Sequence, residues 1–370
     1  MGFLTPAFAR AQEASFDCLK AAAPIELLIC SDPDLIVLDG SLGSAFEASQ
    51  ARLPAEKRAA ALTEQRAWLA QRLTRCEIPS RGDEISPSLR WRAAPCLDEL
   101  YRARLSALGA PAAPTPQPPN GVAEAGFIHP ACLWSLVEQD PETGMAARVP
   151  IAACTLGNRH IPVTETDDGG WSAESASDGY PIWLSYRILG KVASGGDAAV
   201  ISYNSGGSGH FSEIYVLRRA ASPDHKDTML TGEIIGGGGD RCNGGIDQAK
   251  LLDANTLQVD FNVTPQDLLS EADEDMANDN IDALAFCAIC CTGTVRRTID
   301  VTSKNEKTIS ATVVELVSDD ADMDEDEGAQ KCFDGLIHKA APTLPHTFSL
   351  ADLKALAASF SKTCLKTEHP

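Results

Sequence analysis

The sequence lacks long apolar runs and has little basic charge. No stretch reaches about 18 consecutive apolar residues, the length that a membrane-spanning helix needs, so we expect no membrane span. Lysine and arginine total 31 against 52 aspartate and glutamate residues, which gives a formal net charge of −21. Because an acidic surface repels the phosphates of nucleic acid, this balance argues against nucleic acid as a partner.

The chain also lacks the common motifs of nucleotide binding, hydrolysis and zinc binding. Its glycine-rich segment IIGGGGDRCNGGI (234–246) fits neither the P-loop pattern nor G-x-G-x-x-G ahead of a clear helix. Ser205, Ser208 and His210 lie close together in NSGGSGHF, but neither serine has the G-x-S-x-G surroundings of a nucleophile elbow. Cys332 and His338 show no finger-like spacing to other ligands. We therefore expect no catalytic residue, no cofactor and no metal centre.

Cysteine, in contrast, is abundant. Twelve cysteines is an even number and a high one for a reducing compartment, which predicts an oxidising compartment and structural disulfides. The spacing leaves the pairing open. The C-x-x-C within FCAICC is alternatively a redox pair or half of a zinc site, although it lies in a strand-like run. The disulfide candidates are Cys18, Cys30, Cys76, Cys96, Cys132, Cys154, Cys242, Cys287, Cys290, Cys291, Cys332 and Cys364.

The first hundred residues have the apolar periodicity of helices. A long helix is predicted after Ser31 or Asp32, either of which can act as the N-cap, with Pro33 in its first turn. A second helix, LPAEKRAAALTEQRAWLAQRLTRC, ends at Cys76, and a third, CLDELYRARLSAL, begins at Cys96. If the two long helices are antiparallel, the four cysteines of this part gather at one end and form two disulfides.

Cysteine spacing and two short elements occur in a recognisable order over residues 15–108. The elements are Q-x-x-W-L and C-L-x-x-x-Y-x-x-R-L. The matching residues are Phe16, Asp17, Cys18, Glu26, Ile29, Cys30, Asp32, Pro33, Leu35, Leu38, Asp39, Gln65, Trp68, Leu69, Arg72, Cys76, Cys96, Leu97, Tyr101, Arg104 and Leu108. On these residues the region resembles the LprI-type lysozyme inhibitors, a small domain of the bacterial cell envelope. The resemblance implies binding and inhibition of lysozyme, a peptidoglycan-cleaving glycosidase, so lysozyme or another envelope protein is the expected partner.

The region departs from that family in a long insert between its third and fourth cysteines. The insert contains Arg90, Trp91 and Arg92, outside the apolar stripes of the predicted helices. Exposed aromatic and arginine side chains supply much of the binding energy of protein interfaces, so these three are candidate partner-binding residues. Trp68 and Tyr101 lie on apolar stripes instead, which favours core packing for both.

The N-terminal residues 1–14 are typical of the tail of a signal peptide. Small-residue cleavage patterns occur as A-F-A at 7–9 and A-R-A at 9–11, while the apolar core that precedes such a site is missing. We interpret this segment as a signal-peptide remnant. It predicts export, with the periplasm as the expected location.

The pattern changes after the helices. Residues 109–124 form a Pro/Ala-rich linker, and residues 125–370 form an acidic domain of β-like runs separated by Gly, Asn and Asp clusters. RVPIAACTL (148–156) and ALAFCAICCTGTVRRTIDVT (283–302) are two of these runs, and Thr264 and Ser349 predict capped helices. The expected fold is multidomain: a small all-α disulfide-linked helical domain at 15–108, then a β-rich α+β domain with a sandwich-like sheet and a C-terminal helix.

Two kinds of loop in the second domain are candidate ligand-binding sites. Asp240, Arg241 and Asn243 lie in the glycine-rich segment, where freed backbone amides can cradle an anion or where the side chains tie down the turn. The acidic runs EADEDMANDNID (271–282) and SDDADMDEDEG (318–328) carry oxygens of the type that calcium prefers, without EF-hand spacing. A solvated acidic loop is the favoured interpretation of both runs.

Three functions follow from these patterns. The leading hypothesis is an exported bacterial envelope protein that binds and inhibits lysozyme sterically through its N-terminal helices, without enzymatic chemistry. The first alternative is a periplasmic interaction or scaffold module without inhibitory activity. The second is a cell-wall enzyme in the C-terminal half, which requires a cleft where polar groups converge around Asp240, Arg241 or His210.

Overall fold

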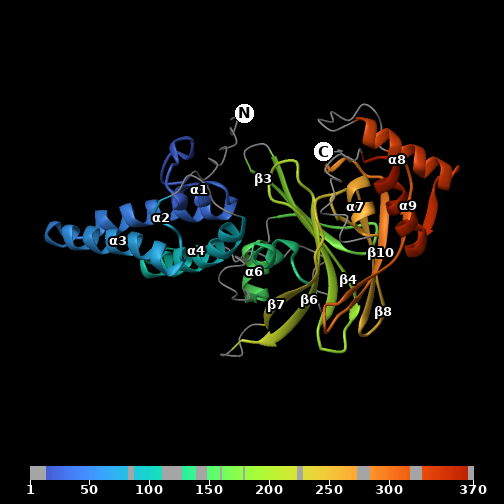
Figure 1. The fold of residues 1–370 in the computed structure, drawn as a ribbon. Coiled ribbons are helices and arrows are strands. Elements are labelled where there is room, and N and C mark those ends of the chain that lie inside the picture. The colour runs from blue at the N-terminus through green and yellow to red at the C-terminus, as the bar shows by residue number, and fades with distance from the viewer. Residues whose placement is uncertain are drawn as a thin grey trace, which may run out of the picture. The chain divides into compact units, whose positions relative to one another are not determined.

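The chain folds as helices followed by two antiparallel sheets, as the computed structural model shows (Figure 1). The structure describes residues 14–81, 87–110, 127–138, 148–158, 161–177, 180–222, 228–272, 284–316 and 327–365. The signal-peptide remnant up to residue 13, the linker from residue 111 and most of both acidic runs lie outside the described residues.

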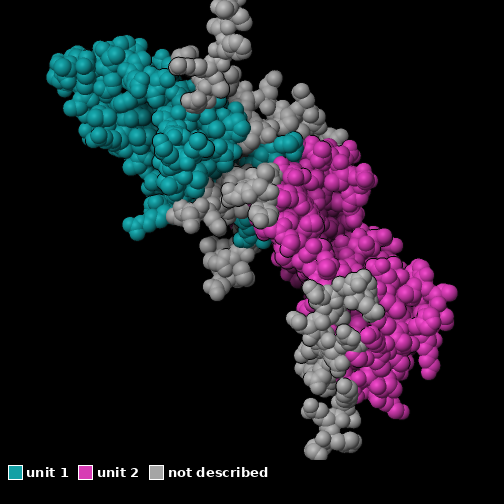
Figure 2. All heavy atoms as spheres, turned by 90° about the horizontal axis from the view of Figure 1, so that it is seen from above, with its two compact units in different colours: residues 1–144, 149–162, 221–229 teal, residues 145–148, 163–220, 230–370 magenta. Residues whose placement is uncertain are grey.

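Two compact units divide the chain (Figure 2). Unit 1 comprises residues 1–144, 149–162 and 221–229, and unit 2 comprises residues 145–148, 163–220 and 230–370. The domain boundaries expected from the sequence, at 15–108, 109–124 and 125–370, remain predictions. None of the helices within the described ranges combines the length and the apolar composition needed to cross a membrane.

Unit 1 is helical. Its elements are η1 (Cys18–Lys20), α1 (Pro24–Cys30), α2 (Pro33–Arg52), α3 (Ala55–Arg75), α4 (Pro87–Ala107), η2 (Pro130–Leu133), α5 (Trp134–Val137), the two-residue strand β1 (Val149–Pro150) and α6 (Ile151–Gly157). Asp32 caps α2 by accepting hydrogen bonds from the amides of Asp34 and Leu35, and Pro33 is its first residue, as predicted. The helix α4 packs against α2, α3 and α6.

The third predicted helix begins earlier than expected. The sequence placed its start at Cys96, but α4 begins at Pro87 and continues through Pro95. Its buried side chains recur every four residues and form one continuous stripe through the helix; they are Leu89, Ala93, Leu97, Tyr101 and Leu105. Burial of this stripe against α1 and α2 outweighs the hydrogen bond that an internal proline removes.

Unit 2 contains two sheets, which confirms the predicted β-rich fold with a C-terminal helix. In the first sheet, β2 (Val163–Glu165), β3 (Trp171–Ser177), β4 (Tyr180–Lys191), β5 (Asp197–Asn204), β6 (Phe211–Ala221) and β7 (Thr228–Gly236) are neighbours in that order. In the second, the order is β12 (His346–Ser349), β11 (Glu306–Val313), β10 (Gly293–Asp300), β9 (Thr256–Val263) and β8 (Ile246–Asp253). The predicted hairpin of AVISYN and SEIYVLRR corresponds to β5 and β6, which pair antiparallel.

One face of the second sheet packs against two different layers. Leu257, Val259 and Phe261 of β9 lie in a core shared with Ile214 and other residues of the first sheet. The next inward residue of the strand, Val263, lies in a core formed with the helices α7 (Pro265–Ser270), α8 (Glu327–Ala340) and α9 (Leu350–Thr363). Because alternate residues of a strand point to the same side, a single face covers the first sheet at one end and the helices at the other.

Two predicted strands are wrong. RVPIAACTL forms only two strand residues and then the helix α6, in a segment whose alanines favour a helix. The first part of ALAFCAICCTGTVRRTIDVT is a loop, and β10 begins only at Gly293. The Cα atoms of Cys287 and Cys290 are 5.1 Å apart across their disulfide, whereas residues three apart in a strand are separated by about 10 Å.

Candidate functional site

All twelve cysteines form disulfides. The helical region contains Cys18–Cys30 and Cys76–Cys96, so each bridge joins cysteines adjacent in the chain. The other pairs are Cys132–Cys154, Cys242–Cys291, Cys287–Cys290 and Cys332–Cys364. The twelve predicted disulfide candidates thus form six crosslinks, and Cys287–Cys290 shows that the C-x-x-C motif is closed.

The most exposed large apolar side chain in unit 1, among the described residues, lies inside the first disulfide loop. Leu19 is 97% exposed and belongs to η1, directly after the bridged Cys18. Leaving a leucine in water forgoes about 1.5–3 kcal/mol of burial energy. A single exposed leucine is ordinary on a protein surface, but this one is presented on a crosslinked turn.

Hydrogen bonds hold that turn in shape on both sides of Leu19. The Asp17 carboxylate accepts from the Leu19 amide at 3.1 Å and pairs with Lys20 at 3.2 Å. Glu26 Oε2 accepts from the amides of Ala22 and Ala23 at 3.1 and 3.0 Å. These backbone donors lower the pKa of Glu26 below its ordinary value, because they stabilise the charged carboxylate. The disulfide loop is therefore organised before any partner binds.

The polar residues that carry the family resemblance form a network between helices. Tyr101 of α4 is fully buried and donates to Asp39 Oδ1 of α2 at 2.5 Å, and Arg72 of α3 contacts the same hydroxyl. Asp39 Oδ2 accepts from the amide and hydroxyl of Ser15 at 2.8 and 2.5 Å. Burial raises the pKa of Tyr101 well above its usual range, so its hydroxyl stays protonated and donates.

Aromatic stacking extends this network along α3. The Arg72 guanidinium lies 5.3 Å from the ring centres of both Trp68 and Tyr101, and the two rings meet edge to face at 5.6 Å. Arg104 donates to Gln65 Oε1 at 3.0 Å and to Glu64 at 2.7 Å. These motif residues join α2, α3 and α4 to one another and so have a structural role in the helical region.

The candidates Arg90, Trp91 and Arg92 lie on the first turns of α4. Their backbone is helical, where the sequence predicted an insert ahead of the helix. Their side chains lie outside the described residues, so their role in binding a partner remains a prediction.

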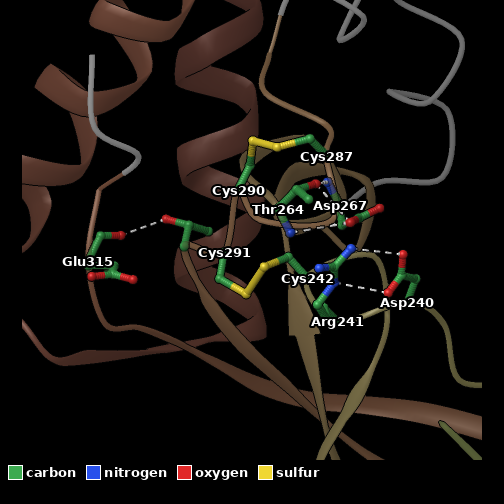
Figure 3. The surroundings of a disulfide bond; sticks show 10 residues. Asp240, Arg241, Cys242, Thr264, Asp267, Cys287, Cys290, Cys291 and Glu315 are labelled. Atoms are coloured by element: carbon green, nitrogen blue, oxygen red, sulfur yellow. Dashed lines mark hydrogen bonds and ion pairs between the residues drawn. A yellow bond between two sulfur atoms is a disulfide. The ribbon is translucent and has the colours of Figure 1, made fainter. Parts of the chain in front are cut away.

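The glycine-rich ligand candidate is a tightly tied turn (Figure 3). The Asp240 and Arg241 side chains form an ion pair at 3.1 Å, and Asp240 also accepts from the His210 amide at 2.7 Å. The amide of Asn243 donates to the Asp240 carbonyl at 2.9 Å, which tightens the turn. A Cβ at Gly239 would lie 1.7 Å from the Asn243 carbonyl, so glycine is needed there for close backbone approach. These contacts give Asp240 and Arg241 structural partners within the turn.

The enzyme alternative gains no support from the neighbouring candidates. The His210 ring packs edge to face against Trp183 at 5.5 Å, while its amide binds Asp240. Within the described ranges, no group of three or more His, Cys, Asp or Glu side chains is placed to hold a metal ion.

Sequence reasoning missed a cavity in unit 2. It has a volume of about 430 Å³ and lies between α8, β12 and α9. Its lining combines apolar side chains such as Leu336 and Phe348 with Lys339, His346 and Asp352. The Asp352 carboxylate accepts from the amide and hydroxyl of Ser349, the N-cap residue of α9, and so completes its capping box. No motif marks this cavity, because its residues come from three separate elements.

Comparison with known proteins bears on the helical region. No curated protein and no solved structure matches the chain. The match to a protein family ends at residue 108 and does not extend into the sheets. Residues 18–108 match the family model described as Lysozyme inhibitor LprI, which confirms the resemblance predicted from the cysteines and the two short elements.

Proposed function

We propose that this chain is an exported bacterial envelope protein that binds lysozyme and inhibits it sterically through its N-terminal helices. The family match over residues 18–108 carries this proposal. Inhibition of this kind needs a preorganised surface that occupies the substrate cleft, and it needs no catalytic group or cofactor. The six disulfides support an oxidising location, for which we propose the periplasm.

We place the lysozyme contact on the disulfide loop that presents Leu19. A rigid turn loses little conformational entropy on binding, so the burial of its exposed leucine contributes to affinity nearly in full. Burying one leucine is worth about 2 kcal/mol, which corresponds to about a 30-fold change in the inhibition constant. The basic and aromatic side chains of Arg90, Trp91 and Arg92 are proposed as a second contact.

The test measures hydrolysis of peptidoglycan by lysozyme in the presence of the full chain, whose disulfides are first confirmed by mass spectrometry. We expect inhibition at micromolar concentration or below, and a Leu19→Asp variant weakened by about 30-fold or more. Leu62→Asp is the matched control, because Leu62 is an exposed leucine (41%) on α3 of the same unit. It should inhibit like the unchanged protein.

Each outcome separates the domain's function from the position of its contact surface. Absence of inhibition by the unchanged chain at micromolar concentration would refute lysozyme inhibition itself. Unchanged inhibition by Leu19→Asp would move the contact away from the disulfide loop, and loss of inhibition by Leu62→Asp would move it to α3. Trp91→Ala tests the second contact in the same assay, where a loss of less than about twofold would remove it.

A further inference from the structure

The loop 284–292 of unit 2 carries two disulfides with different spans. Cys287–Cys290 closes a loop with a sequence separation of 3, whereas Cys242–Cys291 joins the loop to the glycine-rich turn with a separation of 49 (Figure 3). A crosslink stabilises a fold mainly by restricting the unfolded chain, and this effect is smallest for the shortest closed loop. The short bridge is therefore the one that stability needs least.

The shape of the loop does not depend on the short bridge. Besides Cys242–Cys291, the Cys242 amide donates to the Ala288 carbonyl at 3.3 Å. At the start of the loop, the Ala285 amide donates to Gln330 Oε1 of α8 at 3.1 Å. At its end, the Thr292 amide donates to the Val263 carbonyl at 2.9 Å. These contacts fix both ends, so opening Cys287–Cys290 leaves the surrounding fold in place.

The two cysteines of the short bridge differ in exposure. Cys290 is buried at 3% exposure, whereas Cys287 is half-buried. Two large apolar side chains of the same loop face solvent: Phe286 is 52% exposed and Ile289 is 75% exposed. An accessible disulfide sulfur is an electrophile for thiolates, and the apolar neighbours provide contact area for a protein that carries the thiolate.

We propose that Cys287–Cys290 is an exchangeable disulfide that is reduced by a partner protein with two neighbouring thiols. The partner's thiolate attacks Cys287 Sγ, the Cys287–Cys290 bond breaks, and its electron pair leaves on Cys290 Sγ, which takes up a proton. The mixed disulfide joins the partner's first sulfur to Cys287 Sγ. The partner's second thiolate then attacks that first sulfur and releases Cys287 as a thiolate, which is also protonated. The partner dithiol is oxidised to a disulfide, and this chain gains two electrons and two protons.

The full chain and two probes test the proposal: dithiothreitol, and reduced thioredoxin as a protein dithiol. Thiols that form are alkylated over time and assigned by peptide mass spectrometry. Cys287 should be alkylated at least tenfold faster than the cysteines of Cys76–Cys96, Cys132–Cys154, Cys242–Cys291 and Cys332–Cys364 with either probe. Thioredoxin with its second active-site cysteine replaced by serine should be trapped on Cys287. Reduction no faster than that of Cys76–Cys96, or trapping on Cys290, would overturn the proposal.

A matched pair of variants separates docking of a protein from simple access to sulfur. Phe286→Ser with Ile289→Ser should slow reduction by thioredoxin at least fivefold and leave reduction by dithiothreitol unchanged. If thioredoxin reduces the bridge at the same rate before and after the substitutions, Phe286 and Ile289 do not provide a docking contact for the partner. The double variant Cys287→Ala with Cys290→Ala should have the circular dichroism spectrum of the folded chain. If this variant is unfolded, the bridge is structural and the exchange proposal is refuted.

Discussion

Asp39 is a buried carboxylate whose two oxygens are both used. Oδ1 accepts from Tyr101 and lies 3.7 Å from the Arg72 guanidinium, while Oδ2 accepts from Ser15. A buried charge is costly unless it is paired and hydrogen-bonded, so each of these partners is needed. The network therefore gives these polar residues of the motif a structural role between the helices.

Tyr101→Phe should destabilise the helical region by about 2 kcal/mol, because Asp39 and Arg72 each lose a partner in a buried site. Hydrogen exchange of α2 and α4 amides in the full chain measures this, with faster exchange expected in both helices. Tyr203→Phe in unit 2 is the control and should leave that exchange unchanged. If the double variant Tyr101→Phe with Asp39→Asn loses as much stability as the two single variants together, the two groups do not act as one network.

Glu26 gives the disulfide loop a pH dependence of known sign. Its folded-state pKa is lowered by the amides of Ala22 and Ala23, so its contribution is present above the unfolded pKa of about 4.3 and is lost as pH falls through the lower folded value. Glu26→Gln should cost a few tenths of a kcal/mol at pH 7, because the carboxylate is well solvated, and this loss should shrink as pH falls below about 4. Thermal unfolding of both proteins across this range measures the difference. Glu47→Gln, an exposed change on α2, should show no such trend.

Local sequence signals determined several elements and failed at others for identifiable reasons. The expected capping boxes of α7 and α9 are both formed: the cap hydroxyl accepts from the backbone amide of the aspartate three residues later, and the aspartate carboxylate accepts from the backbone amide of the cap residue. The helix α8 was missed because Gly335 weakens its helical pattern, although Phe333 and Ile337 are fully buried. Residues that meet only through tertiary packing, as in the cavity of unit 2, leave no signal along the chain.

The disulfides of unit 2 should differ in their contribution to stability. Cys332–Cys364 connects α8 to the end of α9 across 32 residues, beside the edge-to-face pair of Phe333 and Phe360. From the entropy of loop closure, replacing both cysteines of Cys332–Cys364 by alanine should lower the free energy of unfolding by about 3 to 4 kcal/mol. The same estimate gives about 2 kcal/mol for Cys287–Cys290. Urea unfolding of both variants measures the contrast, and equal losses would show that loop length does not govern these bridges.

Charge is distributed unevenly over the whole molecule. Residues 15–110 hold 13 acidic and 12 basic residues, and residues 1–14 hold one of each, so the chain after residue 110 holds 38 acidic and 18 basic residues. A nearly neutral helical region, which we propose binds lysozyme, is thus joined to a strongly anionic one. Such a field attracts a cationic partner over distance without contributing contacts at the interface.

Binding of a basic animal lysozyme should therefore depend on salt through the association rate. Raising sodium chloride from about 20 to 300 mM shortens the Debye length from about 20 to 6 Å, so the association rate should fall about tenfold while the dissociation rate changes less than twofold. Surface plasmon resonance on the full chain measures both rates. Replacing Asp319, Asp320, Asp322 and Asp324 by asparagine should slow association at low salt only. A salt dependence carried by dissociation would instead place charged pairs within the interface, because breaking a desolvated contact governs the rate of release.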